Sequence, residues 1–451
     1  MATEEASLRV MMFPWLGYGH VSPFLELAKK LSAKNFHIYF CSTPINLNSI
    51  KNRIDSFSSS IELVEFHLPS SPELPPHYHT TNGLPHHLHK TLLQAFNMSK
   101  PNFSDILNNL KPNLLIYDTY QPWVPEIASS HHIPAVNFHC TGAASSCFFY
   151  SNFKLQGKGL QFNFPAIYLR ESEIRKMIAS APYDTEAAED PIYTCVEKSL
   201  DFVLVKSCRA IEDKYINFFS QLLNKKMVTV GPLAQSGEEE EEKDSVIMEW
   251  LSQKGKSSTV FVSFGSENYL CNKKMEELAY GLELSNVNFI WVIRFPSGGE
   301  KIKIGDVLPE GYLERVKERG LVVEGWAPQA KILGHSSTGG FVSHCGWSSV
   351  TESLSYGVPV IAIPMNFDQP LNARLMVELG AGLEVLKDED LEFDREEVAR
   401  VIKEVVVEKS GEGIRCKAKE LSEEIRMKEE GEMCGVVEEL EKIICNKNLD
   451  E

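Results

Sequence analysis

The sequence predicts an α/β protein with two domains, each built on a doubly wound parallel sheet. Short apolar runs of strand type alternate with segments of helical periodicity, and the alternation begins again after residue 258. The 451 residues are also too many for one compact core. Five glutamates, 238–242, stand between the halves beside Gly and Ser. Because such a charge run cannot be buried, we expect a solvated connector there.

The expected elements follow from this alternation. In the first half the strand-like runs are 8–13, 36–41, 61–66, 114–117 and 135–138, and the helical runs include 84–110 and 123–130. In the second half the strand-like runs are 259–263, 289–293, 321–323, 340–343, 359–363 and 383–385, and the helical runs are 244–254, 273–284, 395–407, 413–430 and 432–445. We therefore place the first domain at 1–234, the acidic linker at 235–245 and the second domain at 246–430.

Composition excludes several classes of function. The formal net charge is −17, whereas nucleic acids and anionic membranes bind proteins through Lys and Arg. Apolar runs are all shorter than 18 residues, and the first ten residues are acidic and lack an apolar core, so neither a transmembrane helix nor a signal peptide is expected. Ten cysteines show no CxxC or metal-ligand spacing, which indicates reduced thiols in a cytoplasmic protein.

A histidine stands in the first predicted strand-to-helix turn. The run 8–13 leads into residues 14–20, and apolar residues recur at helical spacing from Val21 onward. Turns of this kind carry the chemistry in α/β sheets. A helix start disfavours the protonated imidazole, so His20 would be neutral and able to accept a proton. By itself, His20 also fits a surface or capping role.

A carboxylate follows a later strand of the same predicted sheet. Asp118 comes directly after the run 114–117, so it should reach the sheet edge that bears His20. An aspartate that accepts one ring N–H fixes the tautomer and stabilises the imidazolium formed after proton abstraction. Asp118 alone also fits an ordinary turn. The pair together predicts a general base and the group that orients it.

The second domain contains a turn suited to anions. The run 340–343 ends in HCGWSS, residues 344–349, before a short helical pattern. Free backbone N–H groups and the helix dipole at such a junction can hold a phosphate, and Gly346 lets the backbone approach it closely. The side-chain donors of this turn are His344, Ser348 and Ser349. A simple capping box, Ser349-x-x-Glu352, accounts for the same residues without a ligand.

Residues 326–369, which begin WAPQ and end NFDQ, match almost end to end the signature box of plant UDP-sugar-dependent glycosyltransferases. The chain therefore resembles this family. The resemblance implies the GT-B architecture, in which two Rossmann-like domains face each other across a cleft. It also implies a terminal helix, 431–451, that packs back on the first domain.

The resemblance assigns a role to each matching residue of the donor site. It implies that Trp326 stacks on uracil, Gln329 lies near the base and ribose, and Glu352 bonds the ribose hydroxyls. The residues implied to hold the diphosphate are His344, Gly346, Ser348 and Ser349, and those implied to address the sugar are Trp347, Asp368 and Gln369. Ala327 belongs to the same box. The family often has Asn where Ser348 stands, and the shorter hydroxyl bonds phosphate less fully. Ser266 either meets the diphosphate or caps a helix.

The resemblance also extends to the reaction and the acceptor. In the family a first-turn histidine and an aspartate after a later strand form the catalytic dyad, which His20 and Asp118 match. The residues expected in an acceptor pocket are Trp15, Gly17, Thr141 and Phe148, although the aromatic stretch 141–153 fits plain helix core as well.

Three further patterns carry little chemistry. Asp388-Glu389-Asp390 matches an Asp-x-Asp metal motif but lies in an acidic run typical of a solvated turn. The histidine-rich segment 69–89 lacks partner ligands at metal spacing and suits a loop over a substrate cleft. A Gly-x-Gly-x-x-Gly turn after a strand, the main dinucleotide fingerprint, is absent.

These observations predict an inverting transfer of glucose from UDP-glucose to an acceptor hydroxyl, with no metal ion or other cofactor. Gln369 goes with glucose in the family. The turns 13–20 and 264–269 resemble the branch that extends the sugar chains of triterpenoid or flavonoid glycosides. Direct glucosylation of an aglycone, a non-catalytic UDP-sugar-binding protein and a doubly wound oxidoreductase are the alternatives. We expect a monomer whose partners are small molecules.

Overall fold

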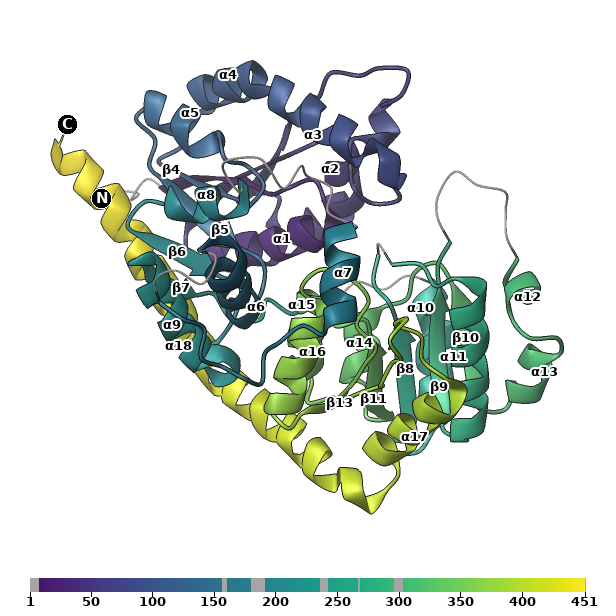
Figure 1. Ribbon diagram of the computed structural model, residues 1–451. Helices are drawn as coiled ribbons and strands as arrows, with labels where there is room; N and C mark the ends of the chain where they lie inside the picture. The colour runs from purple at the N-terminus through teal and green to yellow at the C-terminus, as the bar shows by residue number, and fades with distance from the viewer. Residues whose placement is uncertain are drawn as a thin grey trace. The chain divides into compact units, whose positions relative to one another are not determined.

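The structure is a computed structural model that describes residues 8–155, 160–179, 191–235, 242–266, 268–295 and 303–450 (Figure 1). The chain forms two compact units. Unit 1 comprises Met1–Phe162, Pro182–Leu233 and Lys428–Glu451, and unit 2 comprises Asn163–Ala181 and Ala234–Met427. The predicted acidic run at 238–241 and Glu267 lie outside the described residues.

Unit 1 is built on a seven-stranded parallel sheet in the order β3-β2-β1-β4-β5-β6-β7. The strands are β1 Leu8–Phe13, β2 Phe36–Ser42, β3 Ile61–Glu65, β4 Leu114–Tyr117, β5 Ala135–His139, β6 Phe202–Val205 and β7 Lys226–Thr229. Alternate residues of β1 pack into two different hydrophobic cores. Val10 and Met12 belong to one core, and Met11 and Phe13 belong to the other. Burial on both faces explains why this strand reads as a continuous apolar run.

Helices cover this sheet. They are α1 Tyr18–Ser32, α2 Pro44–Ile50, α3 His89–Met98, α4 Lys100–Leu110, α5 Val124–Ser130, α6 Ala143–Phe149, α8 Pro191–Glu197 and α9 Arg209–Leu223, with short 3-10 turns η1 Lys51–Phe57, η2 Pro76–Tyr78 and η3 His86–Leu88 and a π turn η4 Tyr150–Lys154. The prediction of a single helix over 84–110 is wrong, because the helix is interrupted at Ser99. Pro101 follows at once, and its missing N–H suits a helix start but not a helix interior.

Unit 2 has a six-stranded parallel sheet in the order β10-β9-β8-β11-β12-β13. The strands are β8 Thr259–Ser263, β9 Asn288–Ile293, β10 Gly320–Glu324, β11 Thr338–Ser343, β12 Val360–Ala362 and β13 Gly382–Glu384. The helices are α7 Glu171–Ala179, α10 Glu242–Ser252, α11 Asn272–Ser285, α12 Ile304–Val307, α13 Tyr312–Val316, α14 Gln329–Gly334, α15 Trp347–Ser355, α16 Gln369–Glu378 and α17 Arg395–Val406, with the turn η5 Lys409–Gly411. Two doubly wound parallel sheets confirm the predicted fold class.

The prediction of two terminal helices is wrong, because Glu412–Asp450 form one continuous helix, α18. Gly431 lies inside it with open space around its Cα, and a helix tolerates an interior glycine at a cost of about 1 kcal/mol. From Lys428 onward the helix belongs to unit 1. Its buried residues there recur every three or four positions: Met433, Val436, Leu440, Ile443 and Ile444. They join the core that also contains Val10.

The sequence analysis placed all of residues 1–234 in the first domain, and this prediction is wrong for residues 163–181. This segment, which contains α7, belongs to unit 2. Its buried Glu173 pairs with Arg374, 201 positions later, and that pairing leaves no local pattern in the sequence. Helix α10 also begins inside the predicted linker 235–245.

Among the helices of the described residues, none has both the length and the apolar content needed to cross a bilayer.

Leu440→Ala should lower the free energy of unfolding of unit 1 by about 2–5 kcal/mol, because it empties a fully buried site in the core. Urea unfolding followed by circular dichroism measures this loss. Met427→Ala is the control, since Met427 lies on the same helix and is 74% exposed. Equal losses in the two variants would contradict the packing described here.

Candidate active site

The sheet of unit 1 brings His20 and Asp118 together. Strands β1 and β4 are neighbours although two strands separate them in sequence, and Phe13 is in register with Tyr117. Each strand is followed directly by one of the two site segments. The carboxyl ends of parallel strands meet at one edge of the sheet, so the two segments lie close together. His20 Nδ1 lies 3.0 Å from Asp118 Oδ2. The pairing expected from the sequence is thus present in the structure.

The surroundings of Asp118 keep it ionised. The side chain is fully buried, and its oxygens accept the backbone N–H groups of Trp15 at 2.9 Å and Thr119 at 2.6 Å. Burial alone would raise the pKa of Asp118, but the charge and hydrogen bond of His20 and these two amides outweigh it and lower the pKa. Gln121 Oε1 in turn accepts the backbone N–H of Asp118, which holds the loop in place.

This geometry sets the chemistry that His20 can perform. A carboxylate at Nδ1 requires a proton on that nitrogen, so Nε2 carries the lone pair. His20 is the third residue of α1, where the helix dipole disfavours a charged ring before a proton is taken up. The side chain is 21% exposed, so a substrate can reach it. A neutral base backed by a buried carboxylate is the arrangement that deprotonates a hydroxyl group.

The sequence did not identify Cys140 as a neighbour of this pair. Ligating atoms of His20, Asp118 and Cys140 all lie within 4.8 Å of one another. Cys140 follows β5, the strand next to β4, so the strand-end rule could have found it. Burial, and after it the charge of Asp118, raises the pKa of the Cys140 thiol. A protonated thiol is a poor metal ligand, although the three side chains together could accept a thiophilic cation.

The residues expected in an acceptor pocket occupy different surroundings. Trp15 is buried and packs against Phe96 and Tyr120, with ring centroids 5.0 and 5.6 Å away. Gly17 caps α1, and Thr141 Oγ1 lies 2.7 Å from His139 Nε2. Phe148 is half-buried, and its ring lies edge-on to Phe162. Their contact with an acceptor stays a prediction.

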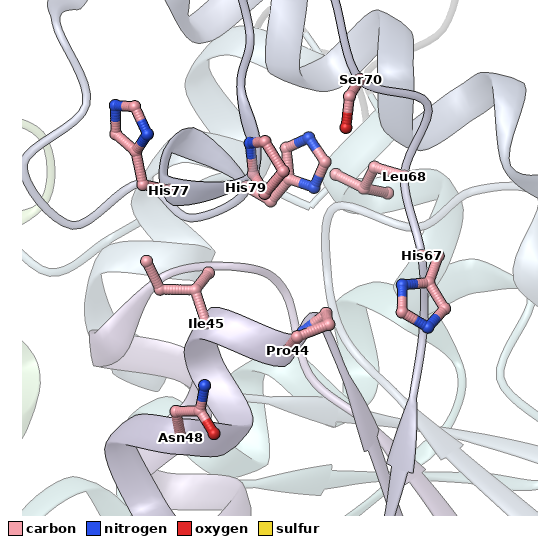
Figure 2. A pocket seen from close by; sticks show the side chains of 9 residues that line it. Pro44, Ile45, Asn48, His67, Leu68, Ser70, His77 and His79 are labelled. Atoms are coloured by element: carbon pink, nitrogen blue, oxygen red, sulfur yellow. The ribbon is translucent and has the colours of Figure 1, made fainter.

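A small cavity of about 290 Å³ opens elsewhere in unit 1 (Figure 2). Figure 2 shows residues of α2 on one side and the histidine-rich segment on the other. The lining residues are Pro44, Ile45, Asn48, His67, Leu68, Ser70, Pro76, His77 and His79. His79 is buried, and its Nε2 lies 3.3 Å from the carbonyl of Leu74, which ties the segment to itself. Among the described residues, these histidines do not form a metal-ligand cluster.

In unit 2 the predicted anion turn lies between β11 and α15. Gly346 precedes the helix, and the ring of His344 packs between two glycines. A Cβ on Gly346 would lie 2.5 Å from His344 Nε2, and one on Gly265, whose φ is +75°, would lie 2.7 Å from Cε1. The sequence assigned Gly346 to close approach of a phosphate. The structure shows that both glycines also make room for the imidazole.

His344 is a neutral, buried imidazole. Burial lowers its pKa to about 4, although a hydrogen bond to the backbone of Ser263 opposes the shift. Nδ1 is buried without a hydrogen-bond partner, so the bonded nitrogen is Nε2, which donates to the carbonyl. An orphaned buried nitrogen of this kind marks a place where a ligand can complete the hydrogen bonding.

The predicted nucleoside residues lie in the loop between β10 and α14, at the start of α14 and on α15. Gln329 Nε2 donates to Glu352 Oε2 over 2.6 Å, so the amide orients the carboxylate. Trp326 is 53% exposed, and the Arg294 guanidinium lies 5.5 Å from its ring centroid. Ala327 is buried beside them. An exposed indole beside an oriented carboxylate suits a planar base and a ribose diol.

Two of the predicted sugar residues, Asp368 and Gln369, lie at the start of α16, whereas Trp347 is the first residue of α15. Gln369 Oε1 accepts the backbone N–H groups of Met365 and Asn366 at 3.0 and 2.9 Å, so its NH₂ group is the end available to a hydroxyl. Asn372, which the sequence did not single out, donates to Asp368 Oδ2 and to the carbonyl of Cys345. It therefore links this loop to the anion turn.

The other predicted residues of the donor site differ in burial. Trp347 and Ser349 are buried, while Ser348 and Ser266 are half-buried. The carboxylate of Asp388 accepts the backbone N–H groups of Asp390 and Glu392, as expected of a turn.

The two sheets, the base and the anion turn define a GT-B glycosyltransferase. Residues 201–414 match the family model "UDP-glucoronosyl and UDP-glucosyl transferase", and residues 6–235 match "Glycosyltransferase, N-terminal domain". The chain belongs to this family of UDP-glycosyltransferases and is an enzyme of that class.

Two curated relatives and one solved structure show the extent of the similarity. UDP-glucosyltransferase 29 of Panax ginseng is 52% identical, with 100% of each chain covered. The β-D-glucosyl crocetin β-1,6-glucosyltransferase of Gardenia jasminoides is 51% identical over 96% of this chain and 98% of the relative. The crystal structure of Glycyrrhiza uralensis UGT73P12 complexed with glycyrrhetinic acid 3-O-monoglucuronide superposes with a TM-score of 0.85 at 24% identity, covering 98% of this chain and 97% of that chain.

Gly346→Ala should weaken UDP binding by about 10-fold, equivalent to about 1.4 kcal/mol, because the new methyl group forces the His344 ring out of place. Calorimetric titration with UDP measures the effect. Gly305→Ala is the matched control, since a Cβ at Gly305 meets nothing within 4 Å. An unchanged dissociation constant for Gly346→Ala would contradict the role of this turn.

Proposed function

We propose that this enzyme transfers glucose from UDP-glucose, with inversion, to a sugar hydroxyl of a plant glycoside. The observation that carries the proposal is the 3.0 Å hydrogen bond between His20 Nδ1 and the buried Asp118. A protein that only bound a UDP-sugar would have no use for a neutral base held in this way. Two similar proteins named as glucosyltransferases support glucose as the transferred sugar.

In the proposed reaction His20 Nε2 takes the proton of the acceptor hydroxyl. The acceptor oxygen forms a bond to the anomeric carbon of glucose while the bond from that carbon to the diphosphate breaks. UDP leaves with the bonding electron pair, and a single displacement inverts the configuration. Asp118 stabilises the imidazolium that forms, because its ionised carboxylate already faces Nδ1.

The diphosphate is proposed to bind at the start of α15. The free N–H groups of this helix start and the positive end of its dipole face the developing charge of the leaving group. Such a site needs no metal ion, so activity should survive EDTA. The EDTA experiment is needed because the ligating atoms of His20, Asp118 and Cys140 lie close enough together to hold a metal ion.

The acceptor is proposed from the relatives. The Gardenia jasminoides enzyme is named for a substrate that already carries glucose. By analogy, the acceptor here is a glycoside of a triterpenoid or flavonoid, and direct glucosylation of an aglycone is the second candidate. We further propose that the enzyme works as a monomer in the cytoplasm.

The proposed activity predicts that wild-type enzyme adds one hexose to glycosides when UDP-glucose is supplied. Mass spectrometry of products from a panel of glycosides and their aglycones, with and without EDTA, measures this. His20→Ala should lower turnover by about 10²–10⁴-fold, the usual contribution of a general base. It should leave the affinity for UDP unchanged, since the nucleotide residues are intact.

The controls separate the parts of this proposal. Asp118→Asn should lose turnover with UDP binding retained, because it removes the charge that faces the imidazolium. Nucleotide binding without UDP release on any acceptor would instead favour a non-catalytic binding protein. An active His20→Ala variant would refute the assignment of the base.

UDP-glucose binding should be coupled to proton uptake by His344. At neutral pH the free ring has its proton on Nε2, whereas phosphate oxygens can only accept hydrogen bonds. A bond from Nδ1 to the diphosphate that also keeps the bond to Ser263 therefore requires a second proton, and affinity should rise as pH falls from 7 towards the pKa of about 4. Calorimetry in buffers with different ionisation heats measures the uptake.

His344→Gln is the control for this coupling, because its amide can donate a hydrogen bond but cannot titrate. The buffer dependence of the binding heat should disappear in this variant. The same heat in all buffers for wild-type enzyme would show that the ring stays neutral when the diphosphate binds.

A further inference from the structure

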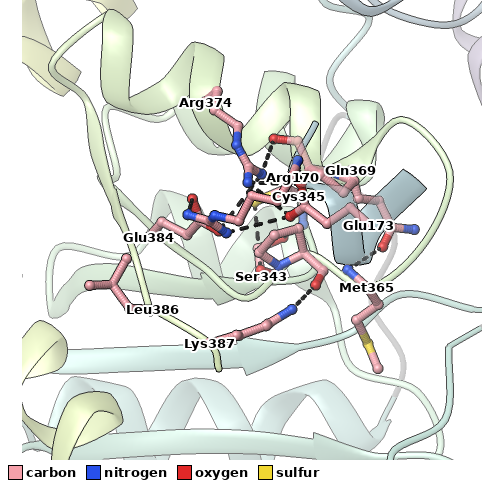
Figure 3. Close-up of polar contacts among 12 residues, drawn as sticks. Arg170, Glu173, Ser343, Cys345, Met365, Gln369, Arg374, Glu384, Leu386 and Lys387 are labelled. Atoms are coloured by element: carbon pink, nitrogen blue, oxygen red, sulfur yellow. Dashed lines mark hydrogen bonds and ion pairs between the residues drawn. The ribbon is translucent and has the colours of Figure 1, made fainter. Parts of the chain in front are cut away.

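Helix α7 carries a row of charged residues that meets the sugar end of the predicted donor site (Figure 3). The helix lies far from that site in the sequence yet belongs to unit 2. Figure 3 shows Arg170 and Glu173 directed at Arg374 and Glu384, close to Gln369 and Met365. The four charges comprise two arginines and two glutamates, so the cluster is neutral as a whole.

Glu173 and Arg374 form a buried, two-point ion pair. Arg374 Nη2 lies 2.8 and 3.0 Å from the two carboxylate oxygens of Glu173, and the side chains are 4% and 7% exposed. Arg374 Nη1 also donates to the carbonyl of Pro370 in the first turn of α16. A guanidinium held at both ends transmits the position of α7 to the turn that begins with Gln369.

Arg170 extends the same cluster to the edge of the sheet. Its guanidinium lies 2.7 and 3.3 Å from the two oxygens of Glu384, the last residue of β13. Its backbone N–H also donates to Glu173. The start of α7 is thus fixed against both a strand and α16, which leaves little freedom for the helix.

Two lysines hold the loop that leads to Gln369. Lys176 Nζ on α7 donates to the carbonyl of Met365 over 2.9 Å, and Lys387 donates to the carbonyl of Pro364. Burial lowers the pKa of Lys387 to about 8, with the charge of Lys274 acting in the same direction. On the other side of the peptide chain, Gln369 accepts the N–H groups of Met365 and Asn366. The loop is therefore clamped at its carbonyls and at its amides.

We propose that α7 is a positioning element for the transferred sugar. Through Glu173 and Arg374 it fixes α16, and through Lys176 it fixes the loop 364–368, so that the NH₂ group of Gln369 is held where it can distinguish sugar hydroxyls. This inference rests on the proposed binding of the sugar at Gln369. Residues encoded in the first half of the chain then help to select the donor.

The test compares Lys176→Met and Glu173→Gln with wild-type enzyme. Steady-state kinetics with UDP-glucose and UDP-galactose, together with the dissociation constant of UDP, give the required quantities. In both variants kcat/KM for UDP-glucose should fall by about 10- to 100-fold, because a displacement of about 1 Å can cost about 10²-fold. The preference for UDP-glucose over UDP-galactose should narrow, while the dissociation constant of UDP stays within about 2-fold of wild type, since UDP lacks the sugar.

Arg400→Met is the matched control. Arg400 lies in the same unit and pairs with Glu397 and Glu404, but its side chain is 52% exposed. Its removal should leave both kinetic quantities unchanged, because exposed ion pairs hold little in place. Circular dichroism of each variant checks the fold. If Glu173→Gln does not fold, the Lys176→Met variant alone tests the proposal. Methionine keeps the length of the side chain but cannot donate a hydrogen bond to the carbonyl of Met365.

Each outcome separates this inference from the proposed function. Folded variants with wild-type kcat/KM and donor preference would overturn the positioning role, and so would a parallel loss of UDP affinity, which indicates general damage to unit 2. A wild-type enzyme that binds UDP but transfers no glucose would instead refute the proposed function. A narrowed donor preference with intact UDP binding supports both.

Discussion

The structure depends on one constraint of parallel sheets, which is that the carboxyl ends of all strands reach the same edge. In unit 1 the central neighbours β1 and β4 deliver His20 and Asp118 to each other. In unit 2 the central neighbours β8 and β11 deliver Gly265 and His344 to each other in the same way. In both sheets the order of strands reverses between these two neighbours, so no crossing helix covers the edge there. The fold therefore prepares two open positions before any ligand contact is considered.

Burial then decides the charge of the groups placed at these positions. Asp118 is buried yet stays ionised, because two backbone N–H groups and an imidazole face its oxygens. His344 is buried with only one hydrogen-bond partner and stays neutral. Loss of water disfavours the charged form of both side chains. Asp118 is nevertheless ionised because it has several hydrogen-bond partners, whereas His344 is neutral because it has only one. In the proposed mechanism the first position takes a proton from a hydroxyl group, and the second binds the diphosphate.

Local patterns made most of this predictable. Strand positions other than β6 and β7, which the sequence analysis did not predict, follow from periodicity. The His20 and Asp118 pair follows from the strand-end rule, and the order of the donor residues follows from the signature box. Helix α7 was assigned to the wrong domain because its partner Arg374 lies 201 positions away. The packing of His344 between two glycines was missed for the same reason, since Gly265 lies in another turn. The uninterrupted α18 was missed because tertiary packing overrides the low helix propensity of Gly431.

The turn that precedes His20 is also tied to the histidine-rich segment. The carbonyl of Leu16, in the turn that precedes His20, accepts hydrogen bonds from Thr80, Thr81 and Asn46. The middle of the histidine-rich segment is thereby tied to the turn that precedes His20, and other residues of the segment, Ser70, Pro76, His77 and His79, line the small cavity of unit 1. The segment is held at a second point, because Thr43 Oγ1 donates to the carbonyl of His79. Because the sheet sets the His20 and Asp118 geometry, changes in this segment that keep Thr80 and Thr81 in place should leave that geometry intact.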